Sequence, residues 1–208
     1  MFDNPLRGRF NAWLLDALDG YMHAKYGVLK VSLLGSIPGT VVELGPGAGA
    51  NFRYYPAGTH VIAVEPNKRM HERLMRQALR RGVRLELLPA AGESLPLPNQ
   101  SVDLVLVTLV LCSVSNPQAV ISEARRVLRP GGRFVCIEHV AAPRTSFLFR
   151  VQRLLADPWR WLFEGCHLLR DTETTLRDAG FTKITVQPVL LRTLFVPIRY
   201  QIAATCTA

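Results

Sequence analysis

The stretch TVVELGPGAGAN, residues 40–51, decides how this chain folds. An apolar run at 40–44 ends directly in a loop that carries Gly45, Gly47 and Gly49. Glycine adopts backbone angles that other residues avoid, and it lets the main chain approach a ligand closely. The pattern predicts a buried strand whose carboxyl end carries a ligand-binding loop.

Two acidic residues flank this loop and narrow the kind of ligand. Glu65 follows Gly45 by twenty positions and ends a second apolar run, HVIAVE at 60–65. A carboxylate there can accept both hydrogen bonds of a ribose diol. Glu43 precedes the loop, where it repels a pyrophosphate and attracts an ammonium group. The glycines also fit the loose dinucleotide pattern G-x-G-x-x-G/A, so a nicotinamide cofactor and a purely structural turn remain alternatives at this point.

Strands and helices alternate on both sides of this loop. The predicted strands lie within 40–44, 60–65, 83–88, 101–111 and 133–139, and the predicted helices span 67–82 and 117–132. Asn67 is the expected cap of the first helix, and Gly82 is its expected end. The strands are apolar on both faces, which is typical of a parallel sheet covered by helices.

The two ends of the chain depart from this alternation. Residues 5–34 carry an apolar helical stripe that includes Trp13 and Tyr21, with Gly20 and Gly27 expected to divide the segment. We expect this helix to pack on the domain, with a peripheral membrane helix as the alternative. Two aromatic-rich helical stretches follow the core, and the last two apolar runs predict an antiparallel hairpin. These segments span 141–180, 181–189 and 198–208.

Charge and length limit the classes of protein to consider. The 208 residues suffice for one domain, and the net charge is +9. The basic residues are scattered, whereas a nucleic-acid footprint gathers on one face or segment. No signal peptide is expected, and the longest apolar run of about 11 residues is short for a membrane helix. We therefore expect no nucleic acid as a partner.

The four cysteines carry their own prediction. Cys112, Cys136, Cys166 and Cys206 form no C-x-x-C pair and no spaced ligand set. This pattern favours reduced thiols in a cytoplasmic protein and argues against a disulfide framework and a zinc site. The sequence therefore predicts that no metal is bound.

Four stretches together resemble the class I S-adenosylmethionine-dependent methyltransferases of the type 11 group. They are ELGPGAG (43–49), VEP (64–66), AGESLPLPNQSVDLV (91–105) and VLRPGGRF (127–134). The resemblance implies an α/β, Rossmann-like, seven-stranded sheet of order 3-2-1-4-5-7-6, with the last strand antiparallel and helices on both faces. It also implies S-adenosyl-L-methionine as cofactor and S-adenosyl-L-homocysteine as product.

A narrower resemblance follows from four further stretches. They are GANFRYYP (49–56), TLVLCSV (108–114), EHVAA (138–142) and DPWRWLFEGCHLLR (157–170). In this order they are similar to the animal alkyl thiol S-methyltransferases of the methyltransferase-like group, which implies a small-molecule thiol as methyl acceptor. The animal proteins begin with a hydrophobic membrane anchor. No transmembrane anchor is expected here, and peripheral membrane contact stays open.

The resemblance assigns residues to each part of the cofactor. Glu43 and the glycine loop would surround the methionine part, Glu65 would hold the ribose, Gly92 and Glu93 would border the adenine, and the end of the fourth strand would line the rest. The full set is Glu43, Gly45, Pro46, Gly47, Gly49, Asn51, Glu65, Pro66, Asn67, Gly92, Glu93, Thr108 and Leu109.

The acceptor side is predicted from position along the sheet. Cys112 lies just past the fourth strand, so it is either a small buried hydrophobe or part of the pocket wall, with a metal ligand disfavoured. His139 ends the fifth strand and is either a general base or a structural histidine. His167 is a second candidate base, Arg170 a candidate for lowering the pKa of a thiol, and His23 a candidate cap over the cofactor. Trp159, Trp161 and Phe163 either wall the acceptor pocket or pack in the core.

Together these features predict one methyltransferase domain with four parts. They are an N-terminal helical cap (1–37), a cofactor-binding core (38–140), a helical lid (141–180) and a terminal hairpin (181–208). The predicted reaction is methyl transfer to the thiol of a small molecule. A phospholipid or small-molecule N- or O-acceptor is the alternative within the class, because a fold does not fix function. A nicotinamide-dependent oxidoreductase and a non-catalytic cofactor-binding module are the alternatives outside it.

Overall fold

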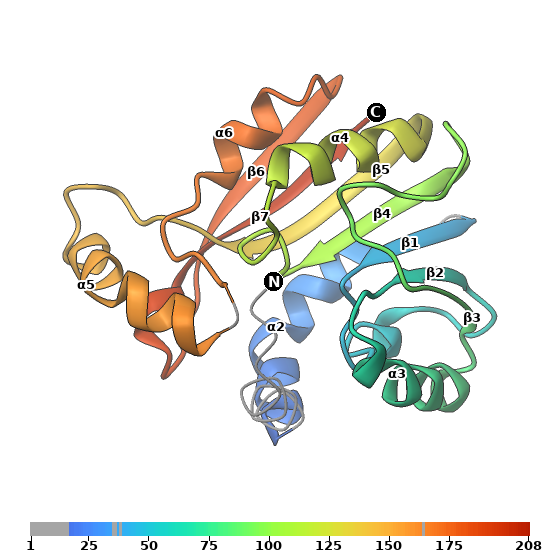
Figure 1. Cartoon of the computed structure of the whole chain (residues 1–208), viewed down its shortest axis with the longest axis horizontal. Coiled ribbons are helices and arrows are strands. Elements are labelled where there is room, and N and C mark those ends of the chain that lie inside the picture. The colour runs from blue at the N-terminus through green and yellow to red at the C-terminus, as the bar shows by residue number, and fades with distance from the viewer. Residues whose placement is uncertain (1–16, 35–36, 38, 164) are drawn as a thin grey trace.

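A seven-stranded sheet forms the centre of the molecule (Figure 1). The computed structural model describes residues 17–34, 37, 39–163 and 165–208, so the predictions for residues 1–16 lie outside it. The sheet order is β3-β2-β1-β4-β5-β7-β6. The strands are β1 (Thr40–Leu44), β2 (His60–Val64), β3 (Arg84–Leu88), β4 (Val102–Thr108), β5 (Leu128–His139), β6 (Lys183–Leu190) and β7 (Tyr200–Thr207). β7 is antiparallel to both of its neighbours, and the remaining pairs are parallel, which confirms the predicted fold class.

Helices cover both faces of the sheet, as its apolar strands require (Figure 1). They are α2 (Asp19–Leu34), α3 (Lys68–Arg81), α4 (Pro117–Val127), α5 (Phe147–Leu162) and α6 (Thr172–Arg177), with short 3-10 turns at η1 (Phe52–Tyr54) and η2 (Val196–Ile198). Val42 and Leu44 share one buried cluster with α4 and α6, whereas Val41 shares another with α2 and α3. This alternation is the period of two expected of a strand buried on both faces.

The predicted elements agree with the structure except at two places. Asn67 caps α3 by accepting from Arg69 N, and Gly82 ends it in the left-handed conformation, as predicted. The helix predicted over 117–132 is wrong beyond Val127, because Leu128 already pairs with Val102 in the sheet and the Pro-Gly-Gly segment lies within β5. The helical conformation is disfavoured for a residue that precedes proline, here Arg129 before Pro130, which is consistent with the early end of α4.

The other difference concerns α2, whereas β6 agrees with the strand predicted within 181–189. α2 continues through Gly27, so the predicted division at that glycine is wrong for the described part of the chain. β6 includes Pro188, which pairs with Ile202 of β7. A proline is tolerated there because β6 is the edge strand of the sheet.

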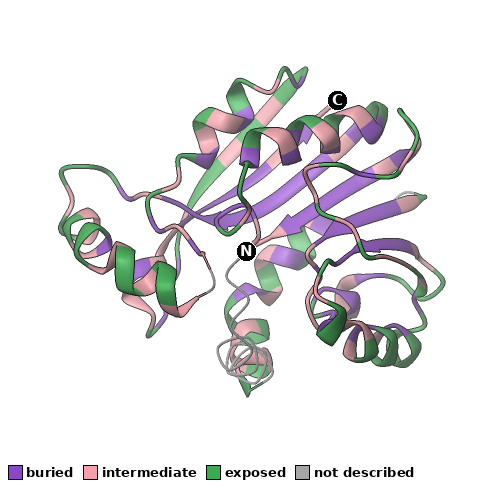
Figure 2. Ribbon diagram, in the orientation of Figure 1, coloured by how far each residue is buried: buried purple, intermediate pink, exposed green. Residues whose placement is uncertain are grey.

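The inner strands of the sheet are the most buried part of the molecule, whereas the edge strands β3 and β6 have no buried residue, and α5 has the fewest buried residues among the long helices (Figure 2). Every residue of β1 except the first is buried, whereas Gln152 is the only residue recorded as buried in α5. Phe147, Leu154 and Trp161 of α5 are 78%, 79% and 65% exposed. Among the described helices, none has the length and apolar character needed to cross a membrane.

Candidate functional site

The glycine loop joins the end of β1 to η1 and lies where a ligand is expected in an open parallel sheet. Gly45, Gly47 and Gly49 have φ angles of 60°, 57° and 85°, which favour glycine. A Cβ atom at Gly45 would lie 2.7 Å from Val110 Cγ2, so the loop packs directly on the segment after β4. A Cβ atom at Gly47 would meet nothing within 4 Å. The backbone at Gly47 therefore faces open space that a ligand can fill.

Glu65 ties this loop to the end of β2. Its Oε2 accepts a hydrogen bond from Gly47 N at 3.0 Å, and its Oε1 accepts one from Asn67 N at 2.8 Å. Burial raises the pKa of Glu65, and the two backbone donors oppose that shift. Each carboxylate oxygen keeps a second lone pair, so Glu65 can accept two further bonds from a diol. Pro66 beside it is exposed.

Glu43 lies beneath the loop and is 1% exposed. Its two oxygens accept hydrogen bonds from Asn51 Nδ2 at 2.8 Å and from Tyr55 OH at 2.7 Å. Burial raises the pKa of Glu43, while these two bonds and the charge of Lys30 oppose the shift. Glu43 thus fixes Asn51 and Tyr55 beneath the loop. Neither Tyr55 nor Lys30 was among the predicted site residues. Tyr55 lies in the quoted stretch 49–56, but its contact with Glu43 is formed only in the fold, and Lys30 lies in none of the quoted stretches.

Asn51 also connects the loop to the end of β4. Its Nδ2 atom donates to Thr108 Oγ1 at 3.2 Å. The next residue, Leu109, has a φ of 57°, which is uncommon for a residue with a side chain, and its N atom donates to Ile137 O at 2.9 Å. Backbone conformations that are energetically unfavourable, such as this one, occur preferentially at ligand-binding sites. The structure therefore brings Asn51 and Thr108 together, and their role toward a cofactor stays a prediction.

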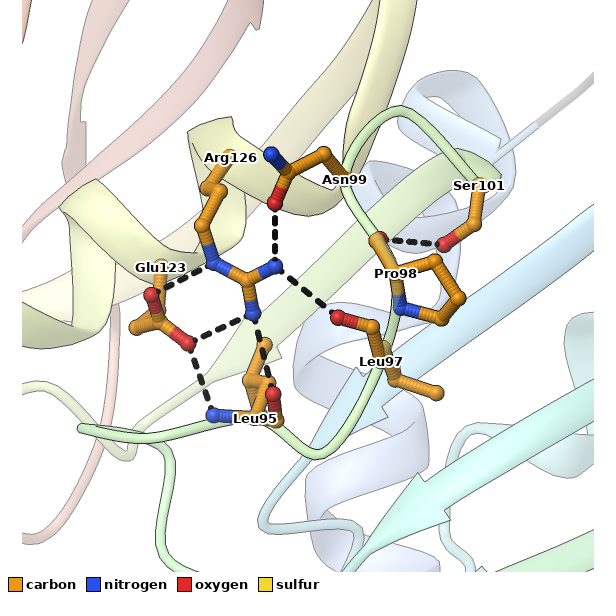
Figure 3. A network of polar contacts seen from close by, with 7 residues as sticks. All are labelled: Leu95, Leu97, Pro98, Asn99, Ser101, Glu123 and Arg126. Atoms are coloured by element: carbon orange, nitrogen blue, oxygen red, sulfur yellow. Dashed lines mark hydrogen bonds and ion pairs between the residues drawn. The ribbon is translucent and has the colours of Figure 1, made fainter.

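The segment predicted to border the adenine is fixed by an arginine on α4 (Figure 3). Arg126 donates to Leu95 O at 2.9 Å, Leu97 O at 2.9 Å and Asn99 Oδ1 at 2.7 Å. It also pairs with both oxygens of Glu123, and Glu123 Oε2 accepts from Leu95 N at 2.8 Å. Arg126 and Glu123 therefore hold the loop that contains the predicted contacts.

The two predicted contacts themselves lie just before this anchored stretch. Gly92 and Glu93 are half-buried, and Asn116 N reaches Glu93 Oε1 at 3.5 Å. The sequence analysis assigned Gly92 and Glu93 but not the pair that positions their loop. An arginine and an acid at a spacing of three on a predicted helix are a weak signal, because such pairs are common on helix surfaces.

Glu138 is a second buried acid that the sequence analysis missed. It is 0% exposed, and its carboxylate accepts from the N atoms of Val110, Leu111 and Cys112 at 2.7, 3.0 and 3.4 Å. Burial raises the pKa of Glu138 to about 7, against these donors. Glu138 therefore binds the end of β5 to the loop that follows β4, and it fixes the backbone of Cys112.

Two cysteines and a histidine meet directly beyond this loop. His139 Nε2 lies 3.0 Å from Cys166 Sγ, and Cys166 Sγ lies 3.7 Å from Cys112 Sγ. Trp159 Nε1 donates to Cys166 Sγ at 3.3 Å. The expectation that Cys112 has no partners for metal ligation is wrong in three dimensions, because its partners come from segments far apart in the sequence. We call Cys112, His139 and Cys166 the sulfur–imidazole cluster.

Protonation in this cluster is shared between its members. The hydrogen bond with Cys112 and the contact with His139 lower the pKa of Cys166 to about 4, although burial alone would raise it. The hydrogen bond between the two cysteines, together with burial, raises the pKa of Cys112. Burial lowers the pKa of His139, but the bond to Cys166 and the charges of Cys166 and Glu138 raise it above its ordinary value. The arrangement favours a thiolate at Cys166 beside a protonated imidazole.

The remaining predicted acceptor residues are dispersed around the cluster. The rings of Trp159 and Phe163 lie 4.2 Å apart, and Trp161 is 65% exposed. Arg170 Nη2 donates to Val114 O at 2.6 Å, and His167 N donates to Cys112 O at 2.8 Å. Burial, followed by the charges of Arg170 and Arg160, lowers the pKa of His167.

Two surface pockets formed by described residues lie away from these strand ends. One of about 520 Å³ runs along α2 and is lined by residues that include His23, Gly27 and Val31. The other, of about 460 Å³, lies beside Arg126 and Ala208. His23, the predicted cap, contacts Tyr54 OH through Nδ1 at 2.7 Å. The candidate site is therefore identified from the arrangement of its functional groups and not from the volume of a pocket.

Comparison with known proteins identifies the family to which this chain belongs. A family model described as a methyltransferase domain matches residues 42–136. Human thiol S-methyltransferase TMT1A is 40% identical over 153 residues, which is 72% of this chain and 63% of that protein. Human thiol S-methyltransferase TMT1B is 36% identical over 194 residues, which is 88% of this chain and 80% of that protein. This chain thus spans about 63% of the length of TMT1A.

The solved structures agree with the sheet. A crystal structure of an S-adenosylmethionine-dependent methyltransferase from Thermotoga maritima, described as a possible histamine N-methyltransferase, superposes with a TM-score of 0.67. It covers 96% of this chain and 94% of its own, at 22% identity. At that identity the likeness concerns the fold alone.

Proposed function

This chain belongs to the class I S-adenosylmethionine-dependent methyltransferases, and we propose that it transfers a methyl group from S-adenosyl-L-methionine to the thiol of a small molecule. The observation that carries the proposal is the short path from the glycine loop to the sulfur–imidazole cluster. Thr108 accepts a hydrogen bond from Asn51 of the loop, and Cys112 follows Thr108 by four residues. The identity of 36–40% to thiol S-methyltransferases supports the choice of acceptor.

The residues around the loop fit a sulfonium nucleoside. Glu65 retains free lone pairs for the two ribose hydroxyls. The open space at Gly47 admits the methionine part, and Glu43 provides the buried negative charge that favours its ammonium group. A pyrophosphate would be repelled by the same carboxylate, which disfavours a nicotinamide cofactor. Gly92 and Glu93 would border the adenine.

The chain has a limited chemical task in this reaction. The methyl group of a sulfonium is already activated, and the acceptor displaces a neutral thioether in line, so the protein contributes alignment and exclusion of water. A thiol must first lose its proton, because the thiolate is the nucleophile. His139 ends β5 and contacts Cys166, which follows α5, so an imidazole lies where it can favour that ionisation.

Two measurements test this function. S-adenosyl-L-homocysteine should raise the thermal midpoint of the purified protein, whereas NAD should leave it unchanged, because a ligand stabilises the state that binds it. Labelled S-adenosyl-L-methionine should then methylate members of a panel of thiols in preference to amines, phenols and a phospholipid amine. Stabilisation by NAD alone would favour the oxidoreductase, and cofactor binding without transfer to any acceptor would favour a binding module.

The setting of the reaction belongs to the same proposal. All four cysteines are buried with free thiols, which fits a reducing compartment such as the cytoplasm. The proposed partner is a small-molecule thiol and not a nucleic acid.

A further inference from the structure

We propose that Cys112, His139 and Cys166 form a zinc site whose fourth position binds the acceptor thiolate. The identity of the acceptor group rests on the proposed function, but the metal site does not. Cys112 follows β4, His139 is the last residue of β5, and Cys166 follows α5, so each comes from a different part of the chain. Two thiolates and one imidazole are a ligand set that zinc uses in catalytic sites, with one position left open.

The distances suit a tetrahedral ion. The three ligand atoms lie within 4.8 Å of one another. The sulfur atoms of Cys112 and Cys166 are 3.7 Å apart. Two thiolates on one tetrahedral zinc ion are about 3.7 Å apart when each Zn–S bond has its usual length of about 2.3 Å. His139 Nε2 lies 3.0 Å from Cys166 Sγ and would need to move outward by about 0.5 Å on the same geometry.

The backbone around the ligands is already fixed. Glu138 accepts from Cys112 N, and Cys112 O accepts from His167 N, so each cysteine backbone lies next to a hydrogen bond between the segments. His139 lies in β5, where its backbone pairs with Gln201 of β7. Backbone hydrogen bonds therefore fix the segments that carry the three ligands.

The side chains around the cluster favour a metal that binds thiolates. Cys112, His139 and Cys166 are 2%, 2% and 8% exposed. Trp159 Nε1 donates to Cys166 Sγ, which is the kind of outer hydrogen bond that tunes a thiolate ligand. His139 Nδ1 is buried and has no hydrogen-bond partner among the described residues, so the ring is oriented through Nε2 and the sulfur atoms. Soft sulfur ligands with imidazole favour zinc over magnesium or calcium.

The open position gives the metal a role in the transfer. The acceptor thiol coordinates the ion and releases its proton to solvent. Its sulfur lone pair then forms the new S–CH₃ bond while the bond between the methyl carbon and the sulfonium breaks, and that electron pair stays on the neutral thioether product. Two cysteine thiolates already neutralise the zinc charge, so the bound acceptor thiolate keeps its nucleophilic character. The methylated thioether is a poor ligand and leaves.

The metal content of the full-length protein tests the site directly. Protein produced with zinc in the medium should contain about one zinc per chain by elemental analysis. Cys112→Ser and Cys166→Ser should reduce this at least tenfold. Cys136→Ser, which alters an equally buried thiol of β5 outside the cluster, should retain the metal. Protein that carries no stoichiometric zinc and does not bind added zinc would overturn the proposal.

Cobalt substitution supplies a readout that needs neither a variant nor activity. Co²⁺ in the wild-type site should give thiolate charge-transfer absorption and the intense visible bands of a four-coordinate ion. Addition of a short alkyl thiol without the methyl donor should shift these bands. Unchanged bands would refute thiol coordination, and an octahedral spectrum without charge transfer would refute the cysteine ligands.

The outcomes separate the site from the function. A strong chelator should lower thiol methylation at least 100-fold, and zinc should restore it. Full thiol methylation by metal-free protein would overturn the zinc site and leave the proposed function standing. Bound zinc with no methylation of any thiol in the panel would overturn the proposed function and the role of the open position, while the three-ligand site would stand.

Discussion

The two halves of the candidate site are built in different ways. On the cofactor side, the glycine loop is held by Glu43 and Glu65, whose partners lie 8, 12 and 18 residues away along the chain. On the acceptor side, the contacts of Cys166 with Cys112 and His139 join residues that are 54 and 27 positions apart. Oxygen and nitrogen atoms make the first half, and sulfur and imidazole make the second.

This difference separates binding from chemistry. Short-range contacts around a rigid loop create a fixed surface that is suited to a common cofactor. Long-range contacts bring together groups that change their protonation when they meet, which is typical of reactive centres. Substitutions in one half should therefore change cofactor affinity, and substitutions in the other should change transfer.

The largest effect is expected at Cys166. Cys166→Ser removes the low-pKa thiol and its contacts with Cys112 and His139, so thiol methylation should fall by roughly 1,000-fold, within the range of acid–base catalysis. The affinity for S-adenosyl-L-homocysteine, measured by calorimetry, should change less than about threefold. Cys136→Ser is the matched control and should change neither. A loss of cofactor affinity in Cys166→Ser as large as the loss of transfer would remove the distinction between the halves.

The second effect is expected at Glu65. Glu65→Ala removes a charged acceptor and releases Gly47 N and Asn67 N, so the affinity for S-adenosyl-L-homocysteine should fall about 100-fold, or about 3 kcal/mol. Glu86→Ala, on the neighbouring strand β3 and away from the loop, provides the control. Saturating cofactor should restore most of the transfer rate in Glu65→Ala. An unchanged affinity would show that Glu65 does not hold the ribose.

A third and smaller effect is expected at Arg126. Arg126→Met removes the bonds that hold Leu95, Leu97 and Asn99, so the loop with the predicted adenine contacts should loosen (Figure 3). We expect about a tenfold loss of affinity for S-adenosyl-L-homocysteine and a much smaller loss for the adenine-free fragment homocysteine. Arg125→Met alters the adjacent exposed arginine as a control. Equal losses for both ligands would place the adenine elsewhere.

The smallest effect concerns the pH dependence of stability on the cofactor side. Burial lowers the pKa of Lys30 to about 8. The positive charge of Arg53 lowers this pKa further, whereas the negative charges of Glu43 and, more weakly, Asp19 raise it. Between pH 8 and the ordinary pKa of 10.5 the unfolded chain binds more protons than the folded one, so stability should rise with pH. The slope should approach about 1 kcal/mol per pH unit.

Denaturant unfolding at pH 7.5, 8.5 and 9.5 measures this slope. Lys30→Met retains most of the buried side chain without its charge and should lack the rise, so the difference between the two proteins isolates Lys30 from the other titrating groups. A parallel pH dependence in both proteins would contradict the lowered pKa.

The sequence predicted the sheet well because its signals are local. Each strand near the glycine loop is a continuous apolar run, and Asn67 and Gly82 mark the ends of α3 in the structure as in the pattern. The helix end at Val127 was not predicted, because pairing between Leu128 and Val102 is a tertiary contact. Where the local helical preference of the sequence competes with strand pairing, the strand pairing decides where the helix ends.

The candidate site was predictable to the same extent. Glycines and acids in contiguous motifs identified the cofactor side, although not the role of Tyr55, whose hydrogen bond to Glu43 joins residues 12 positions apart. On the acceptor side, spacing rules led to the conclusion that the cysteines have no ligand partners, because such rules detect ligands only within one short segment. Glu138 and Cys166 were missed for the same reason, since their partners lie in distant segments.

The central claim is that one half of the site binds the methyl donor and the other half activates the acceptor. Calorimetric titration of S-adenosyl-L-homocysteine into wild-type protein, Glu65→Ala and Cys166→Ser tests it most directly. The account predicts one binding site per chain in the wild type, an affinity about 100-fold weaker in Glu65→Ala and an affinity close to wild type in Cys166→Ser. Wild-type protein that binds no S-adenosyl-L-homocysteine, or two variants that lose affinity equally, would contradict it.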